Sequence, residues 1–143
     1  MDDMERRGEL AFQYASVAQV RIARPTERLQ EVVAFYRDGL GLRELERFED
    51  HHGYDGVILG LPGRTYQLEF MQRRRGGPCS PPSADNLLVL YVPHADQILT
   101  ISERLERRGC RPVEPENPYW LGHSVTYEDP DRWRVVLCNG AGS

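Results

Sequence analysis

Residues 35–42 read Phe-Tyr-Arg-Asp-Gly-Leu-Gly-Leu and mark where an amphipathic helix ends in two closely spaced glycines. Glycine is common just past a helix C-terminus, so Gly39 and Gly41 predict that end. At the other end, Pro25 stops a preceding strand, and Thr26 is a residue type favoured at a helix N-cap. Between these signals, apolar residues recur at the three- and four-residue spacing of a buried helix face. They are Leu29, Val32, Val33, Phe35, Tyr36 and Leu40.

Strands are predicted on both sides of this helix. The stretch 16–24 alternates well enough for a strand before it. After it, Tyr66, Leu68 and Phe70 alternate with polar neighbours, which favours a strand that shows one face to a core. Glycine and proline turns separate the strands of this half. The predicted strands after the helix are 42–49, 54–61 and 66–71, with turns at 50–53 and 62–63.

The same order of elements returns after residues 73–83, a segment rich in glycine, proline and serine that we interpret as a linker. The second half predicts a strand at 86–92, a helix at 95–108 and strands at 111–113, 119–127 and 133–138. The pattern βαβββ therefore occurs twice, in module one (16–72) and module two (84–139) of a single domain, 16–143, behind a leader, 1–15. A half of about 60 residues is marginal by itself. We predict an α+β fold in which the two modules form a curved mixed sheet around a cleft.

The composition excludes several classes of function. All 18 basic residues among the 143 are arginine, so chemistry that needs a lysine amine is ruled out, whereas arginine still binds carboxylate and phosphate. The net charge of −4 argues against nucleic acid as a partner, and the arginines of 73–75 are interpreted as a solvated loop.

No apolar run reaches the roughly 20 residues of a membrane span. The charged start 1–8 predicts no signal peptide. Three scattered cysteines suggest neither a zinc ribbon nor a disulfide framework, and we expect a cytoplasmic protein.

Three motifs in this order resemble the vicinal oxygen chelate superfamily, which includes glyoxalase I, extradiol dioxygenases, and fosfomycin- and bleomycin-resistance proteins. The motifs are the helix exit at 35–42, the strand Tyr-Gln-Leu-Glu-Phe at 66–70 and the turn Glu-Asp-Pro-Asp at 128–131. The resemblance covers residues 16–139. It implies paired βαβββ modules, assembled as a homodimer whose clefts bind a small-molecule ligand.

Metal-dependent members of this superfamily take histidine and glutamate ligands from the first and last strands of each module. Carried onto this chain, one of these positions keeps its ligand, Glu69. The other positions fall on Arg21 (or Gln19 with a shift of two), on Asn86 or Leu88, and on Val136. Because catalytic metal sites usually need three protein ligands, we predict that the usual metal site is lost and that no cofactor is bound. A divalent metal in a relocated site using His52, His94 or His123 is the alternative.

Glu69 is the first candidate for the site, with Gln67 beside it because alternate residues of a strand share a face. It is either a general base and anchor for a cationic ligand or a carboxylate paired with Arg21. Arg21 itself is a candidate to bind an anionic ligand group, and Gln19 shares its face. Arg24, on the opposite face, is interpreted as a surface charge at the end of the strand.

Two further groups are candidates outside that strand pair. His52, with Tyr54, is an acid–base candidate if the turn closes over the cleft, and otherwise an exposed turn residue. Tyr119, Trp120 and His123 could form an aromatic wall for a flat ligand, or could be buried in the sheet or at a dimer contact.

Two hypotheses follow for the function. One is a metal-free enzyme that uses Glu69 and His52 as acid–base groups. The other is a binding protein of the bleomycin-resistance type, for which the net charge of −4 and the aromatic residues suit a cationic or flat ligand. The sequence predicts a small-molecule-binding protein without the usual metal and leaves open whether it is an enzyme. The alternative is a metal-dependent, glyoxalase-like lyase or dioxygenase.

Overall fold

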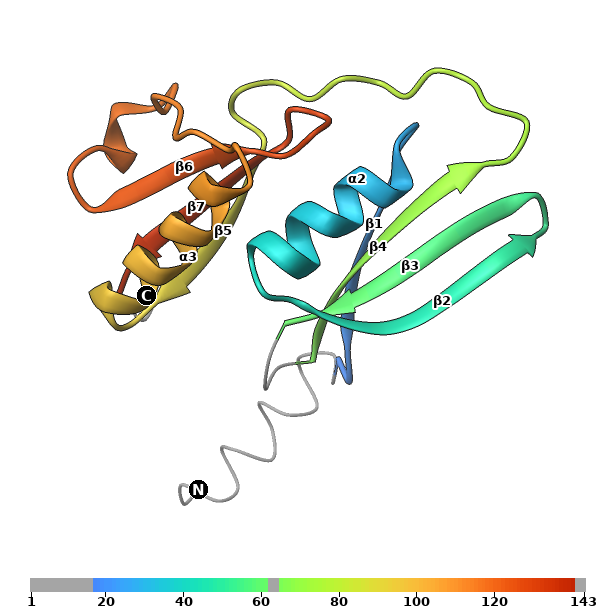
Figure 1. Cartoon of the computed structure of the whole chain (residues 1–143), viewed down its shortest axis with the longest axis horizontal. Coiled ribbons are helices and arrows are strands. Elements are labelled where there is room, and N and C mark those ends of the chain that lie inside the picture. Colours follow the sequence, from blue (N-terminus) through green and yellow to red (C-terminus); the bar gives the residue numbers. More distant parts are fainter. Residues whose placement is uncertain (1–16, 62–64, 141–143) are drawn as a thin grey trace, which may run out of the picture.

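The chain forms two β-sheets, each with a helix on one face (Figure 1), in a computed structural model that describes residues 17–61 and 65–140. The first sheet follows the order β1-β4-β3-β2, with β1 parallel to β4 and the other pairs antiparallel. Helix α2 runs directly into the π-helical turn η1. The elements are β1 (Val20–Pro25), α2 (Leu29–Val33), η1 (Ala34–Gly39), β2 (Arg43–His51), β3 (Tyr54–Gly60) and β4 (Tyr66–Arg73).

The second sheet follows the order β5-β7-β6, again with a parallel pair (β5 and β7) and an antiparallel pair (β6 and β7). Its elements are β5 (Leu87–Val92), α3 (Ala95–Arg107), η2 (Pro118–Trp120), β6 (Ser124–Glu128) and β7 (Arg134–Asn139). The α+β class, the paired modules and the mixed sheets are thus confirmed. The predicted leader 1–15 and the turn at 62–63 lie outside the described residues.

Two strand predictions in module two were wrong. The predicted strand 111–113 is a single antiparallel bridge between Val113 and Thr126. The predicted strand 119–127 begins only at Ser124, because the residues before it form the 3₁₀ helix η2. Pro118 removes a backbone donor at its first position, and the Asn117 side chain accepts the N–H of Tyr119 at 3.0 Å. These local bonds replace the pairing that a strand would need.

The start of the first helix also differs from the prediction, because Thr26 is not its N-cap. Arg28 occupies that position and makes no capping bond, while the Thr26 hydroxyl accepts the N–H of Arg28 at 3.1 Å. The side chain of Gln72 on β4 does the capping. Its amide oxygen accepts the N–H of Leu29 at 3.0 Å, and its amide nitrogen donates to the carbonyl of Glu27 at 2.9 Å. The helix start is therefore fixed by the sheet on which the helix packs.

One hydrophobic core runs through both modules, from α2 and η1 to α3 and β7. The glycines of the 35–42 stretch make this contact possible. A Cβ on Gly39 would lie 2.7 Å from the Leu105 side chain of α3. Gly41 has φ +88°, which disfavours other residues, and a Cβ there would lie 2.9 Å from the Arg104 guanidinium. Arg104 also donates to the carbonyl of Gly39 at 2.6 Å. The stretch that ends the first helix therefore also joins the two modules.

In the described part of the chain, no helix has the length and apolar character needed to cross a membrane.

Candidate functional site

The first candidate group is a polar triad of Arg21, Gln67 and Glu69 on neighbouring strands β1 and β4. Because Leu68 and Phe70 are buried in the core, the residues that alternate with them face the opposite side of the sheet. On that side, Arg21 Nη1 lies 3.3 Å from a Glu69 oxygen. Arg21 Nε and Nη2 donate to the Gln67 amide oxygen at 3.1 and 3.0 Å. The pairing of Arg21 with Glu69, one of the two alternatives that the sequence left open, is present.

The triad leaves several hydrogen-bonding groups free among the described residues. Glu69 Oε2 and the Gln67 amide nitrogen have no protein partner there. The Arg21 side chain is 43% exposed and the Glu69 side chain 17% exposed, so both can meet a ligand. One positive and one negative charge cancel within the triad. The face therefore presents donors and an acceptor with no net charge.

The second group is an aromatic cluster of Tyr119, Trp120 and His123, formed by η2 and the residues after it. The Trp120 and His123 rings stack with centroids 6.2 Å apart and planes at 27°. Tyr119 meets both rings edge-on, at 4.9 and 5.6 Å. Tyr119 is 67% exposed. The three aromatic side chains that the sequence singled out thus lie together, on a helical turn and loop and not in a strand.

The third group lies at the turn between β2 and β3. His52 is exposed there with φ +52°, and it lines a small pocket with Tyr54 and the arginines at the end of β4. Tyr54 pairs with Arg73, four residues beyond Glu69, so roughly 13 Å of strand separates it from the triad. Gln19 precedes β1, is exposed, and makes no side-chain hydrogen bond with the described residues. The sequence candidates thus form separate groups within one chain.

The positions that the resemblance implies for metal ligands carry few side chains that could coordinate a metal ion. Arg21 and Glu69 are paired with each other, Val136 is fully buried, and Leu88 packs against the core. Asn86 accepts the N–H of Ser83 at 2.9 Å. Among residues 17–61 and 65–140, no three histidine, cysteine, aspartate or glutamate side chains gather closely enough to hold a metal ion.

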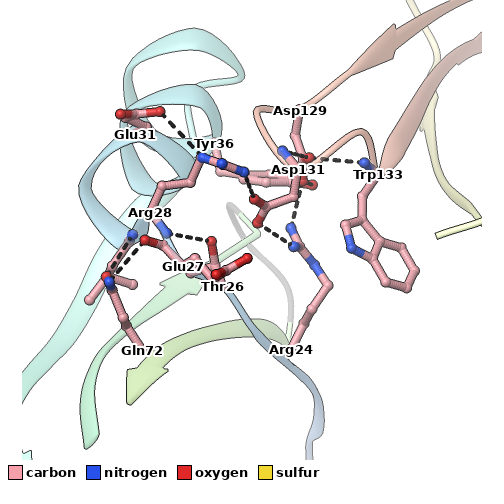
Figure 2. A network of polar contacts seen from close by, with 11 residues as sticks. Arg24, Thr26, Glu27, Arg28, Glu31, Tyr36, Gln72, Asp129, Asp131 and Trp133 are labelled. Atoms are coloured by element: carbon pink, nitrogen blue, oxygen red, sulfur yellow. Dashed lines mark hydrogen bonds and ion pairs between the residues drawn. The ribbon is translucent and has the colours of Figure 1, made fainter. Parts of the chain in front are cut away.

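A buried ionic network, missed by the sequence reasoning, lies where the modules meet (Figure 2). Arg24 is not the surface charge that was predicted: its side chain is 12% exposed and pairs with Asp129 at 2.5 Å and Asp131 at 3.0 Å. Tyr36 donates to the same Asp129 oxygen at 2.7 Å. The other Asp129 oxygen accepts the backbone N–H groups of Asp131 and Trp133 at 2.8 and 2.9 Å. Tyr36 lies in the 35–42 motif, and both aspartates lie in the 128–131 motif. The presence of these two motifs was the sequence signal that could have indicated a contact between the modules.

The network ties β1 and η1 of module one to the β6–β7 turn of module two. The Arg24 guanidinium lies between two aromatic rings, 4.9 Å from the Phe70 centroid and 5.0 Å from that of Trp133. Burial raises the pKa of Asp129 above its ordinary value, while the charge of Arg24 and the Tyr36 hydroxyl oppose that change. Burial, and then the Asp129 charge, raises the pKa of Tyr36 well above its usual range. The network therefore joins the two modules.

A cavity of about 370 Å³ adjoins this network between the two modules. Module one contributes Ile22, Leu68 and Phe70, and module two contributes Leu87 and Trp133. The triad residues do not line it, because they lie on the other face of the first sheet. The polar side chains of Arg24, Asn86 and Arg134 also border the cavity, so the space is mainly apolar with polar groups at its edge.

The fold defines a class of protein. A glyoxylase/bleomycin resistance protein/dioxygenase domain from Frankia sp. superposes with a TM-score of 0.67 at 17% identity, covering 90% of this chain and 99% of that one. The fosfomycin resistance protein FosX from Listeria monocytogenes, solved with Mn(II) and 1S,2S-dihydroxypropylphosphonic acid, gives a TM-score of 0.65 at 16% identity, covering 90% and 94%. The chain thus has the fold of the glyoxalase/bleomycin resistance/dioxygenase superfamily, some of whose members use divalent metals.

Within that superfamily, the chain belongs to the YycE-like family. Residues 20–71 match the YycE-like N-terminal domain, and residues 85–139 match the YycE-like C-terminal domain. The uncharacterized protein YycE of Bacillus subtilis is 47% identical over 131 residues, which cover 92% of this chain and 94% of that protein. Its crystal structure, described as a protein of unknown function, superposes with a TM-score of 0.83 over 88% of this chain and 92% of that one.

Proposed function

We propose that this protein binds a small organic molecule on the open face of module one, at the Arg21–Gln67–Glu69 triad, without a metal ion. The observation that supports the proposal is the contact between Arg21 and Glu69, two residues to which the resemblance assigns metal-ligand positions. An arginine at this position supplies the positive charge that a metal would supply to the carboxylate. It also adds hydrogen-bond donors in a planar fork, which suit an oxygen acceptor on an organic ligand.

The donor set around Glu69 does not fit a divalent metal. A catalytic metal site generally needs three protein ligands, and Glu69 would have to exchange its arginine partner to supply even one. Val136 and Leu88 have no donor atoms, and a guanidinium beside the ion would repel it. We therefore derive no step that runs through a metal.

The triad favours a ligand that is neutral where it meets the protein. The charges of Arg21 and Glu69 cancel, so a fully charged ligand group would gain attraction from one and repulsion from the other. A group with both an acceptor and a donor, such as an amide or a hydroxyl beside a carbonyl, can satisfy Arg21 and the free Glu69 oxygen together. The exposed cluster of Tyr119, Trp120 and His123 is a separate surface that suits a flat aromatic ligand.

Binding is favoured over acid–base catalysis by the separation of the proposed catalytic pair. A general acid or base must come within hydrogen-bond reach of the group it serves. Tyr54, next to the turn that holds His52, lies roughly 13 Å along the strand from the level of Glu69. No contact joins His52 to Glu69 within the described residues. A metal-dependent lyase or dioxygenase remains the second candidate, because FosX combines this fold with Mn(II).

We also propose that the protein is a homodimer that associates through the edge of the first sheet. Strand β1 is an edge strand with no partner on its outer side among the described strands, and Val20 and Ile22 on it are 40% and 56% exposed. Exposed apolar residues on an unpaired edge favour association with another chain. Sedimentation across a range of concentrations should give the mass of two chains, and a monomer throughout would contradict this assembly.

The experiment that tests the proposed function pairs elemental analysis with ligand screening by thermal shift on the full chain. We expect no stoichiometric nickel, zinc, iron or manganese, and stabilisation by neutral aromatic compounds that carry an amide or a hydroxyl beside a carbonyl. Stoichiometric metal in protein purified without added metal would overturn the metal-free proposal. The absence of stabilisation across neutral, cationic and anionic aromatic sets would overturn the binding proposal.

Two substitutions locate the ligand found by that screen. Glu69→Gln removes the carboxylate charge and leaves Arg21 positive, so the affinity for a neutral ligand should fall about tenfold, corresponding to the loss of one charge-assisted hydrogen bond. Glu44→Gln is the matched control, because Glu44 is a partly exposed carboxylate paired with arginines elsewhere on the sheet. Equal effects of the two changes would exclude the triad as the binding site.

A further inference from the structure

A pocket of about 410 Å³ lies at the tip of the β2–β3 hairpin, and three consecutive arginines, 73–75, line it. The other lining residues are His52, Gly53 and Tyr54, so no carboxylate faces this space. Figure 1 shows the hairpin tip at the end of the molecule away from module two. The pocket is therefore separate from the cavity between the modules and from the triad.

The backbone brings the arginines to the hairpin turn. The N–H of Arg74 donates to the carbonyl of Gly53 at 3.0 Å, which extends the pairing of β3 with β4 up to the turn. Directly afterwards, the N–H of Gly76 donates to the carbonyl of Arg73 at 3.0 Å, and Gly76 and Gly77 both have positive φ. This reversal holds the three arginine side chains close to the turn. The segment predicted as a solvated loop thus begins as an ordered wall of a pocket.

The three guanidinium groups are not equivalent. The positive charge of Arg74 is balanced by two carboxylates, because its Nε lies 2.8 Å from Asp55 and 3.9 Å from Asp50. Among the described residues, Arg73 Nε donates to the Tyr54 hydroxyl, at 3.4 Å, and the terminal nitrogens of Arg73 have no partner. Arg75 forms no ion pair or side-chain hydrogen bond with the described residues. Two guanidinium groups with free donors therefore border one space, beside a phenol and an imidazole.

We propose that this pocket binds a tetrahedral oxyanion, either inorganic phosphate or the phosphate group of a monoester. Arginine presents paired N–H donors that match two oxygens of a phosphate group. Arg73 and Arg75 can each take such a pair, and the Tyr54 hydroxyl can donate to a further oxygen. Asp50 and Asp55 reduce the attraction at long range, so recognition depends on these direct contacts. The proposal does not depend on a ligand at the triad, because no triad residue lines this pocket.

The test is a titration of the full chain with inorganic phosphate, monitored through the backbone amide signals in NMR spectra. Phosphate replaces chloride during the titration, so that the ionic strength stays constant. We expect saturable shifts confined to the amides of 52–54 and 73–77. A parallel titration with glycerol phosphate distinguishes the two sources, since tighter binding of the monoester indicates an organic phosphate. Shifts that stay linear, or that chloride reproduces, would overturn the proposal.

Substitutions assign the contacts. Arg75→Gln should weaken phosphate binding about tenfold, the equivalent of one lost charge-assisted contact, and Arg73→Gln should do the same. Arg47→Gln is the control, because Arg47 is an exposed arginine on β2 that pairs with Glu44 outside the pocket. Each spectrum reports whether the variant is folded. If the three variants bind phosphate equally well, the effect is one of general charge and the site is excluded.

Discussion

The substitution Asp129→Asn tests whether the ionic network stabilises the junction of the two modules. The Asp129 side chain has no exposed surface and accepts from Arg24, from Tyr36 and from two backbone N–H groups. Asparagine preserves the size but removes the charge. It leaves the Arg24 guanidinium, 12% exposed, with Asp131 as its one carboxylate partner among the described residues.

The expected loss of stability follows from these contacts. Removing one partner of a buried ion pair costs about 3–5 kcal/mol, because the other charge stays buried without compensation. Asp131 still contacts Arg24 at 3.0 Å, so we expect the lower end of that range, about 3 kcal/mol. This is a large share of the roughly 5–15 kcal/mol by which domains are stable. Asp129→Ala should cost more, because the N–H groups of Asp131 and Trp133 would also lose their acceptor.

Urea unfolding followed by far-UV circular dichroism measures this loss. The midpoint should fall while the slope with urea stays the same, since the change does not alter the surface exposed on unfolding. Asp38→Asn is the control: Asp38 is an exposed carboxylate paired with Arg37, and its removal should cost less than about 1 kcal/mol. If Asp129→Asn costs no more than Asp38→Asn, the network does not hold the modules together, and the reasoning from burial is wrong.

Two other predictions concern the first module. Because the pKa of Tyr36 is raised well above its usual range, only the unfolded chain ionises this residue near pH 10, so stability should fall as the pH rises through that region. Tyr36→Phe should flatten this fall of the unfolding free energy between roughly pH 9 and 11. The control Tyr119→Phe, at an exposed residue, should leave the fall unchanged. If the two variants have the same dependence of stability on pH, Tyr36 is not its source. Gly56→Ala would place a Cβ 2.1 Å from the Phe48 ring and should cost about 1–3 kcal/mol in urea unfolding. Adding Phe48→Ala should make the cost of Gly56→Ala nearly vanish, and a strictly additive double variant would rule out this contact.

The fold was predictable because its signals are local and repeated. The alternation at 66–70 and the helical spacing before Gly39 each identify one element, and the same order of elements appears again after the linker. Predictions failed where a bond from a distant residue decides the local structure. Gln72 caps a helix more than forty residues earlier in the chain, and nothing near Thr26 indicates that. At η2, the hydrogen bond between Asn117 and Tyr119 competes with strand pairing. The aromatic residues there favour a strand prediction, so the sequence does not indicate this bond.

The candidate site was predictable only where strand register brings residues together. Arg21 and Glu69 lie on adjacent parallel strands, and their pairing was one of two alternatives that the sequence and the family resemblance left open. Arg24 was misplaced because its environment depends on the β6–β7 turn, more than a hundred residues away. The pocket at the hairpin tip was missed because the three arginines look like a solvated run until the pairing of Tyr54 with Arg73 places them beside the turn.

The absence of lysine gains meaning from these placements. Arg24 can donate to two carboxylates and contact two aromatic rings at once because its guanidinium is planar and has donors on several edges. A lysine ammonium there would be more strongly hydrated and could not stack between Phe70 and Trp133 in the same way. The same reasoning applies at the triad, where Arg21 serves a carboxylate and an amide together. Replacing Arg21 by lysine would preserve the charge but remove the double contact with Gln67, so the charge alone does not explain the arginine at this position.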